Sequence, residues 1–79
     1  MIEQAERLLT TLGFGPHRVR FHDGNLARLE IQSTDFARLV DPEFRDQLHR
    51  QMRDIGFRFV AVELAEFVSG SLNQLVQIV

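Results

Sequence analysis

Apolar side chains recur every three to four positions in two stretches of the chain, which is the spacing of an amphipathic helix. The first stretch covers residues 2–12 and ends before Gly13, a residue type that often follows the last turn of a helix. The second begins at Asp41-Pro42-Glu43, where a carboxylate can cap the helix and proline suits its first position. Its expected buried stripe consists of Phe44, Leu48, Met52 and Ile55. Gly56 ends this second helix, so the pattern predicts two helices of good length.

Apolar and polar residues alternate in two further stretches, Arg18–His22 and Leu26–Ile31, with the period of a half-buried β-strand. The residues between them, Asp23-Gly24-Asn25, are of types that favour a tight turn. We therefore expect a β-hairpin, with a loop of either two or three residues.

The pattern of faces distinguishes the two loop lengths. A two-residue turn would set Val19 opposite Arg28 and mix apolar with basic side chains. A three-residue loop with Asn25 in the left-handed conformation sets Val19 opposite Leu29, and the apolar residues then share one face. We expect the second register. The other face of the hairpin then carries Arg18, Arg20, Arg28 and Glu30.

Two more elements are expected between this hairpin and the end of the chain. Residues 34–40 predict a short helical turn. Its inward side chains would be Phe36, Leu39 and Val40. Residues 57–64 (FRFVAVEL) are nearly all apolar and β-prone, which predicts a central strand covered on both faces.

The end of the chain allows two structures. Ser71 and Gln74 have the spacing of a capping box, which favours a short helix. The apolar residues that fit this helix are Leu72, Leu75, Val76 and Val79. Residues 75–79 fit a strand equally well. The whole pattern predicts one α+β domain over residues 1–79, in the order α-β-β-α-α-β, with helices packed on one face of a mixed sheet.

Composition excludes several classes of function. The chain has 79 residues, room for one small domain that gains stability from a partner surface. Its net charge of -2 argues against a general attraction to nucleic acid or to an anionic membrane. It contains no cysteine, which excludes disulfides, thiolate nucleophiles and cysteine metal sites. No apolar run has the length of a membrane span, so we expect a soluble, cytoplasmic protein.

The hairpin face that carries Arg18, Arg20 and Arg28 is the first candidate site. Three guanidinium groups held close together repel one another, and Glu30 relieves only part of that repulsion. A phosphate or carboxylate could supply the remaining negative charge through bidentate hydrogen bonds. Two other interpretations remain: a solvated face with cross-strand ion pairs, or arginines that meet acids of a neighbouring subunit.

Ser69-Gly70-Ser71-Leu72-Asn73 is the second candidate. Small residues that open a helix present free main-chain N–H groups to an anion, here together with Ser69, Ser71 and Asn73. The alternative is an ordinary turn followed by a helix cap.

Other chemistry has little support. His17 and His22 lie at opposite ends of one expected strand and on opposite faces, and His49 lies on the exposed side of a helix. A metal site needs three or four ligands that converge, so we expect no metal. No nucleophile and base have a persuasive spacing, which argues against a stand-alone enzyme, and we expect no cofactor.

A set of short motifs occurs in a familiar order along nearly the whole chain. The motifs are Ala5-Glu6, Leu12-Gly13-Phe14, Arg18-Val19-Arg20, His22-Asp23-Gly24, Ala27-Arg28-Leu29-Glu30, Asp41-Pro42-Glu43, Gly56-Phe57-Arg58-Phe59-Val60 and Ser69-Gly70-Ser71-Leu72-Asn73. Together they resemble the C-terminal domain of the LarE-type, ATP-dependent sacrificial sulfur transferases, which belong to the PP-loop ATP pyrophosphatases. Members of that family adenylate a pyridinium carboxylate mononucleotide and transfer sulfur to it.

The resemblance implies a domain that closes an active site and builds an oligomer. It implies that Arg18, Arg20 and Arg28 face phosphate or pyrophosphate, and that Glu6 or Glu30 is an acid near the site or a subunit interface. The family often has arginine before its Ser-Gly-Ser loop, where this chain has Val68.

This chain also has no Ser-Gly-Gly-rich PP-loop and no sulfur-donating cysteine. We therefore expect a non-catalytic module that forms a homo-oligomer, binds a small anion and associates with a protein that carries the PP-loop. The alternative is a purely structural self-association domain without a ligand.

Overall fold

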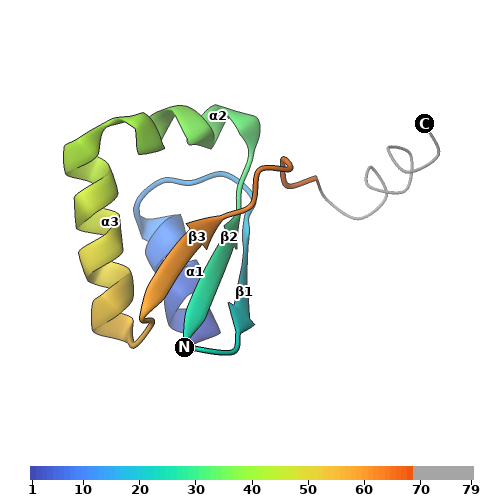
Figure 1. Ribbon diagram of the computed structural model, residues 1–79. Helices are drawn as coiled ribbons and strands as arrows, with labels where there is room; N and C mark the ends of the chain where they lie inside the picture. The colour runs from blue at the N-terminus through green and yellow to red at the C-terminus, as the bar shows by residue number, and fades with distance from the viewer. Residues whose placement is uncertain (69–79) are drawn as a thin grey trace.

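The computed structural model describes residues 1–68, and these form a three-stranded sheet with helices on one side. In chain order the elements are α1 (Ile2–Thr11), β1 (Arg18–His22), β2 (Leu26–Glu30), α2 (Ser33–Phe36), the 3-10 helix η1 (Ala37–Val40), α3 (Pro42–Ile55) and β3 (Phe59–Val62) (Figure 1). The α+β class and the order α-β-β-α-α-β are those expected from the sequence.

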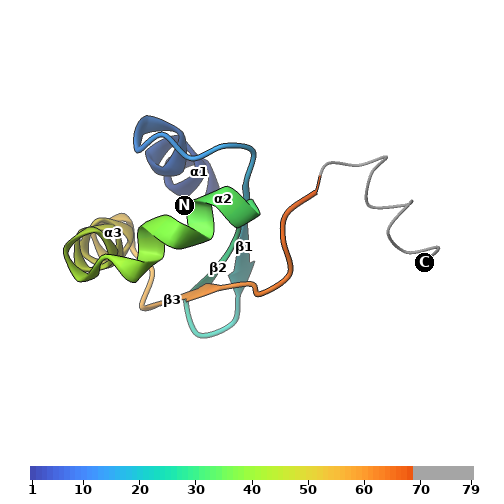
Figure 2. The same cartoon turned by 90° about the horizontal axis from the view of Figure 1, so that it is seen from above.

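The sheet is mixed, and its strand order is β1-β2-β3. The central strand β2 pairs antiparallel with β1 and parallel with β3. The helices lie on one side of this sheet, as the view from above shows (Figure 2). The opposite side of the sheet, here called the open face, carries no helix among residues 1–68.

The core lies between the sheet and its helices. Its buried residues are Ala5 and Leu9 of α1, Phe14, Val19 of β1, Ala27 and Leu29 of β2, Ile31, Leu48 and Met52 of α3, and Phe57. α3 buries Leu48 and Met52 of its predicted stripe and partly buries Phe44 and Ile55. β2 buries Ala27 and Leu29, whereas β1 buries Val19 and leaves Phe21 46% exposed.

The hairpin has the predicted register. Val19 pairs with Leu29, and Phe21 pairs with Ala27. Asn25 has a φ of 58°, in the left-handed region that the three-residue loop requires. The choice between the two loop lengths is thus confirmed.

The boundaries of α3 are also confirmed. Its cap is Asp41, whose carboxylate accepts a hydrogen bond from the amide of Glu43, and Pro42 is its first residue. Gly56 ends the helix with a φ of 131°. At this angle any other residue would be strained.

The prediction of a central, doubly covered strand over residues 57–64 was wrong. β3 is an edge strand, and Phe59 on the open face is 56% exposed. A continuous apolar run is typical of a strand buried on both faces, but β3 is covered on one face only by the residues described. The apolar edge that results is considered further below.

The inward position expected for Val40 was also wrong, because its side chain is 75% exposed. Residues 37–40 form a 3-10 helix, which has three residues per turn instead of 3.6. Phe36 and Leu39 are half-buried in line with each other, while Val40 is rotated away from them.

Candidate functional site

Three arginines share the open face of the sheet. Arg18 and Arg20 alternate along β1, and Arg28 lies on β2 directly opposite Arg20. Glu30 lies opposite Arg18 in the same register. The helices pack on the other face, so the geometry expected for this arginine face is confirmed.

Arg28, in the middle of the face, is held by several partners. One of its terminal nitrogens lies 2.5 Å from a carboxylate oxygen of Glu63 and 3.3 Å from one of Glu30. Its Nε donates a hydrogen bond of 3.1 Å to Nε2 of His22. These contacts engage Nε and one terminal nitrogen of the Arg28 guanidinium, and two carboxylates compensate its charge.

Glu63 is the partner that the sequence did not reveal. Because β3 runs parallel to β2 with Leu29 beside Val62, Glu63, the residue that follows β3, comes close to Glu30. The main-chain amide of Glu63 also donates to the carbonyl oxygen of Leu29. This neighbourhood depends on the crossover connection between β2 and β3, and hairpin alternation alone cannot predict it.

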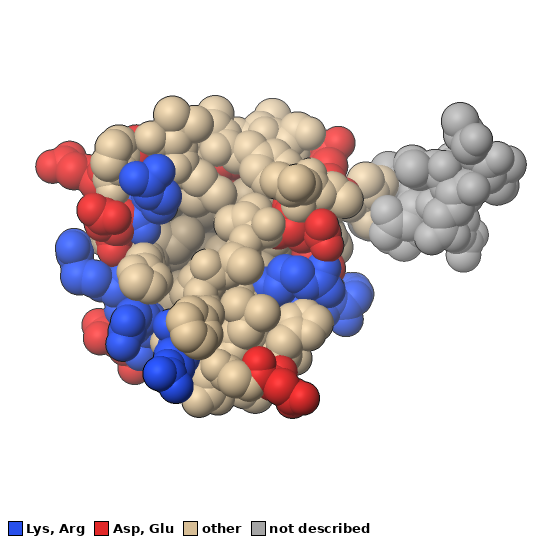
Figure 3. Space-filling view, in the orientation of Figure 1, with Lys and Arg blue, Asp and Glu red and all other residues tan. Residues whose placement is uncertain are grey.

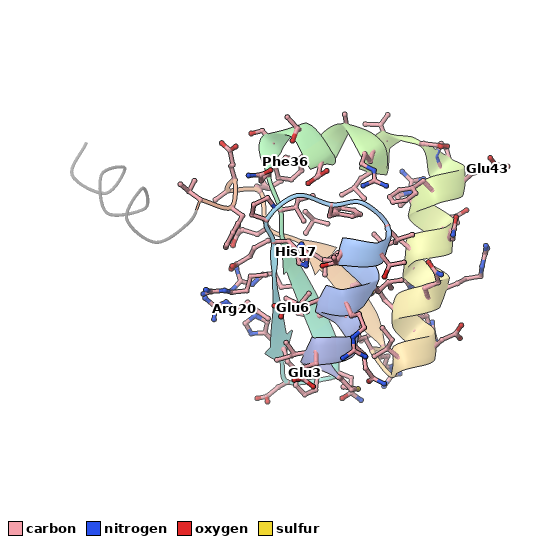
Figure 4. All side chains as sticks on the ribbon, turned by 180° about the vertical axis from the view of Figure 1, so that it is seen from behind. Glu3, Glu6, His17, Arg20, Phe36 and Glu43 are labelled. Carbon is pink, nitrogen blue, oxygen red and sulfur yellow. The ribbon has the colours of Figure 1, made fainter. Side chains whose placement is uncertain are left out.

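The two arginines of β1 are less engaged. Nε of Arg20 lies 3.6 Å from Glu30, and the Arg20 side chain is 47% exposed. The guanidinium of Arg18 lies over the ring of Phe67, 5.9 Å from its centroid. Among residues 1–68, Arg18 has no carboxylate within ion-pair distance. Seen from behind, Arg20 points outward from β1, away from the helices (Figure 4).

These side chains border a hollow of about 380 Å³. Its lining residues are Arg18, Arg20, Glu30, Glu63, Ala65, Glu66, Phe67 and Val68. Basic and acidic side chains lie directly beside one another on this face (Figure 3). When Arg28 is included, this region contains three basic and three acidic side chains, so its net charge is close to zero.

The balance of charge limits which groups can bind an anion. Arg28 is compensated by Glu30 and Glu63, while Glu66 accepts a hydrogen bond of 3.3 Å from the main-chain amide of Ser33. The guanidinium donors that remain exposed to the hollow belong to Arg18 and Arg20. An anion would therefore contact this pair first.

Other residues named from the sequence are not gathered here. Glu6 lies on α1, and its carboxylate accepts a 3.0 Å hydrogen bond from the main-chain amide of Val19 (Figure 4). Ser69, Ser71 and Asn73, and the alternative structures considered for residues 71–79, lie outside the described residues. Val68, where the resembling family often has arginine, borders the hollow.

The histidines lie apart, as expected. The ring nitrogens of His17 lie 2.8 Å from the carbonyl oxygen of Gly15 and 3.0 Å from that of Glu6. His22 lies on the open face beside Arg28. Within residues 1–68, no three side chains form a group that could hold a metal ion.

Comparison with known proteins gives two relatives. The chain is 43% identical over 70 residues to the pyridinium-3,5-bisthiocarboxylic acid mononucleotide synthase of Lactiplantibacillus plantarum, which covers 87% of this chain and 24% of the synthase. It is 31% identical over 74 residues to an uncharacterized protein of Synechocystis sp., covering 94% of this chain and 27% of that protein. No family model matches the chain.

The chain thus spans about a quarter of the length of the relatives it matches. It is related to a segment of a LarE-type protein. Within the part of the chain that the structure describes, no helix is both long and apolar enough to cross a membrane.

Proposed function

We propose that this chain is a non-catalytic oligomerisation and anion-binding module, equivalent to the C-terminal domain of the LarE-type sulfur transferases. In this role it completes the active site of a protein that carries the PP-loop. The similarity to a quarter of the synthase supports the relationship. The chain itself contains neither a PP-loop nor a cysteine that could donate sulfur.

One observation carries the anion-binding part of this proposal. Arg18 and Arg20 border the same hollow, and Arg18 lies on an aromatic ring with no carboxylate partner among residues 1–68. A guanidinium stacked on a ring keeps its edge N–H groups available for hydrogen bonds. The guanidinium groups of Arg18 and of the more exposed Arg20, on alternate residues of one strand, suit the oxygens of phosphate or pyrophosphate.

The test is a titration of the full chain with pyrophosphate, phosphate and sodium chloride at matched ionic strength. Thermal unfolding measures binding, since a ligand that binds only the folded state raises the melting temperature. We expect pyrophosphate to raise it more than matched chloride does. Replacing Arg18 or Arg20 by glutamine should weaken that binding about tenfold, since each loses charged hydrogen bonds.

Arg50→Gln is the matched control, because Arg50 is an exposed arginine of α3. It should leave the pyrophosphate effect unchanged. An equal rise with pyrophosphate and with matched chloride contradicts the anion site.

The partner is tested by coexpression with a separately encoded PP-loop protein. A complex that survives purification at micromolar concentration supports a composite active site. Separate elution of the two chains at that concentration contradicts it.

A second function has its own supporting observation. The open face is balanced in charge and carries the exposed apolar side chain of Phe59. A face of this kind suits a sister chain whose acids meet Arg18 and Arg20, with no ligand involved. In that case added salt should dissociate the oligomer, and pyrophosphate should have no specific effect on the melting temperature.

A further inference from the structure

The outer edge of β3 is unpaired in the described part of the chain. The amides of Phe59 and Glu63 donate to the carbonyl oxygens of Asn25 and Leu29, toward the neighbouring strand β2. Because main-chain groups alternate along a strand, the N–H and C=O groups of Val60 and Val62 point outward. No residue among 1–68 bonds to them.

The opposite edge of the sheet is protected. The outward amide of Val19 on β1 donates to the carboxylate of Glu6, and the charged residues Arg18 and Arg20 flank it. Charges and bonded amides discourage the addition of another strand. The sequence of β3, Phe-Val-Ala-Val, has neither protection.

An apolar groove adjoins this edge. It lies between α3 and β3 and has a volume of about 410 Å³. Its aliphatic lining residues are Leu29, Leu39, Leu48, Val60 and Val62, and Arg45, Asp46 and His49 of α3 complete the lining. In the space-filling view the surface is hollowed between these two elements (Figure 3). An edge with a groove beside it accepts an extended segment whose alternate side chains are aliphatic.

The sequence contains one segment of that composition. From Phe67 to Val79 the chain has no charged residue, and residues 74–79 read Gln-Leu-Val-Gln-Ile-Val. Such a stretch is rich in β-branched and aliphatic residues and is unfavourable in water without a cover.

The path of the described chain favours a second copy as the source of the segment. Phe67 lies against Arg18 of β1, and Val68 borders the hollow beside the same residue. The chain therefore leaves the domain at the β1 side, the edge opposite to the groove (Figure 1, Figure 2).

We propose that residues 74–79 of a second copy of this chain add to the outer edge of β3 as a fourth strand and cover the groove. The outward groups of Val60 and Val62 then bond to the added strand, and alternate aliphatic side chains enter the groove. Reciprocal exchange of the two segments closes a dimer. Direct pairing of two β3 edges is disfavoured, because α3 lies beside β3 where the helix of a symmetric partner would have to fit (Figure 1, Figure 2).

This inference rests on the self-association in the proposed function and is independent of the anion site. Its test uses the absence of cysteine from the chain. Chains that carry Ala61→Cys on β3 are mixed with a second set of chains, each of which has a single cysteine at one of the positions 74–79. Each mixture is then oxidised gently. Residues opposite each other on paired strands lie within disulfide distance.

We expect a mixed disulfide between Ala61→Cys and one or two alternate tail positions, identified by mass spectrometry of peptides. Val40→Cys, at an exposed aliphatic residue of η1, is the matched control and should link to none of them above background. The proposal is overturned if the cysteines at positions 74–79 form disulfides with position 61 no more often than with position 40. A link that forms only within one chain when both cysteines are placed in it also overturns the proposal.

Sedimentation velocity of the full chain gives a second readout. Val76→Asp combined with Ile78→Asp should weaken dimerisation at least about tenfold, because a carboxylate is costly to bury against the aliphatic side chains of Leu29, Val60 and Val62. Unchanged dimerisation overturns the exchange. If the chain forms an oligomer but the cross-links do not form, the exchange of segments is refuted and self-association still holds. If the cross-links form but pyrophosphate has no effect on the melting temperature, only the anion site is refuted.

Discussion

A carboxylate oxygen of Glu63 lies 2.5 Å from a terminal nitrogen of Arg28, and this pair joins the open face of β2 to the end of β3. The two residues are 35 positions apart in the chain. Their contact exists because the crossover through α2, η1 and α3 brings β3 parallel to β2. Glu63 thereby adds a negative charge to a face that the hairpin alone would leave basic.

This pair gives the first prediction. Replacing Glu63 by glutamine removes one of the two carboxylates that compensate Arg28 and raises the charge of the face by one unit. We expect pyrophosphate to bind three- to tenfold more tightly, a gain of about 1 kcal/mol typical of one partly screened charge. Titration at fixed ionic strength measures it.

Glu43→Gln serves as the control for this change, because Glu43 is an exposed acid at the start of α3 and changes the net charge equally. It should leave the affinity within a factor of two or so. Equal gains from both substitutions would show that pyrophosphate responds to net charge alone and not to this face.

The hairpin and the two long helices could be predicted because their signals are local. Asp41-Pro42-Glu43 and Gly56 mark the ends of α3, and Asn25 permits the three-residue loop. Each of these residues acts on main-chain groups within a few positions of itself. The arginine face followed from the alternation of apolar and polar residues in the two strands, which also selected the three-residue loop.

The parts that could not be predicted depend on distant contacts. Strand order places β3 at an edge, although its composition is typical of a covered strand. The carboxylates of Glu63 and Glu66 reach the arginine face only through that strand order. Phe67 is brought under Arg18 by a hydrogen bond between its own amide and the carbonyl oxygen of Ile31. No short-range pattern in the sequence encodes these pairings.

The contact between Glu6 and Val19 gives a second prediction. Glu6→Ala leaves an edge amide without its charged acceptor, which should lower the free energy of unfolding by about 1–2 kcal/mol. Glu6→Gln keeps a neutral acceptor and should lose less. Urea unfolding measures both.

Glu3→Ala is the comparison for that series, since Glu3 is an exposed acid in the first turn of the same helix. It should cost only about 0.3–0.5 kcal/mol through the helix dipole. Equal losses at positions 3 and 6 would mean that helix charge, and not the bond to Val19, accounts for the effect.

The cap of α3 gives a third prediction. Asp41→Ala removes the side-chain acceptor that lies 3.1 Å from the amide of Glu43 and should cost about 1 kcal/mol of folding free energy. Asp41→Ser, which can still cap, should recover most of the loss. Asp46→Ala, at an exposed acid later in the same helix, should change stability by less than about 0.5 kcal/mol. A fully destabilised serine variant would argue that the charge of Asp41 matters more than its hydrogen bond.

The hairpin loop gives the last prediction, on which the arginine face depends. Asn25 has a φ of 58°, and its carbonyl oxygen accepts hydrogen bonds from the amides of Arg58 and Phe59. Asn25→Ala should cost about 1–2 kcal/mol, because alanine tolerates the left-handed region poorly, while Asn25→Gly should stay within about 0.5 kcal/mol of the wild type.

Gly24→Ala provides the calibration for this loop, since Gly24 has a φ of 82° and a Cβ there would meet no atom within 4 Å. Its cost in urea unfolding therefore measures the backbone penalty alone. If Asn25→Ala matches Gly24→Ala, the left-handed conformation of Asn25 accounts for its whole effect and holds the register. If Asn25→Ala costs nothing, the loop has another conformation, and the three arginines are not held on one face by it.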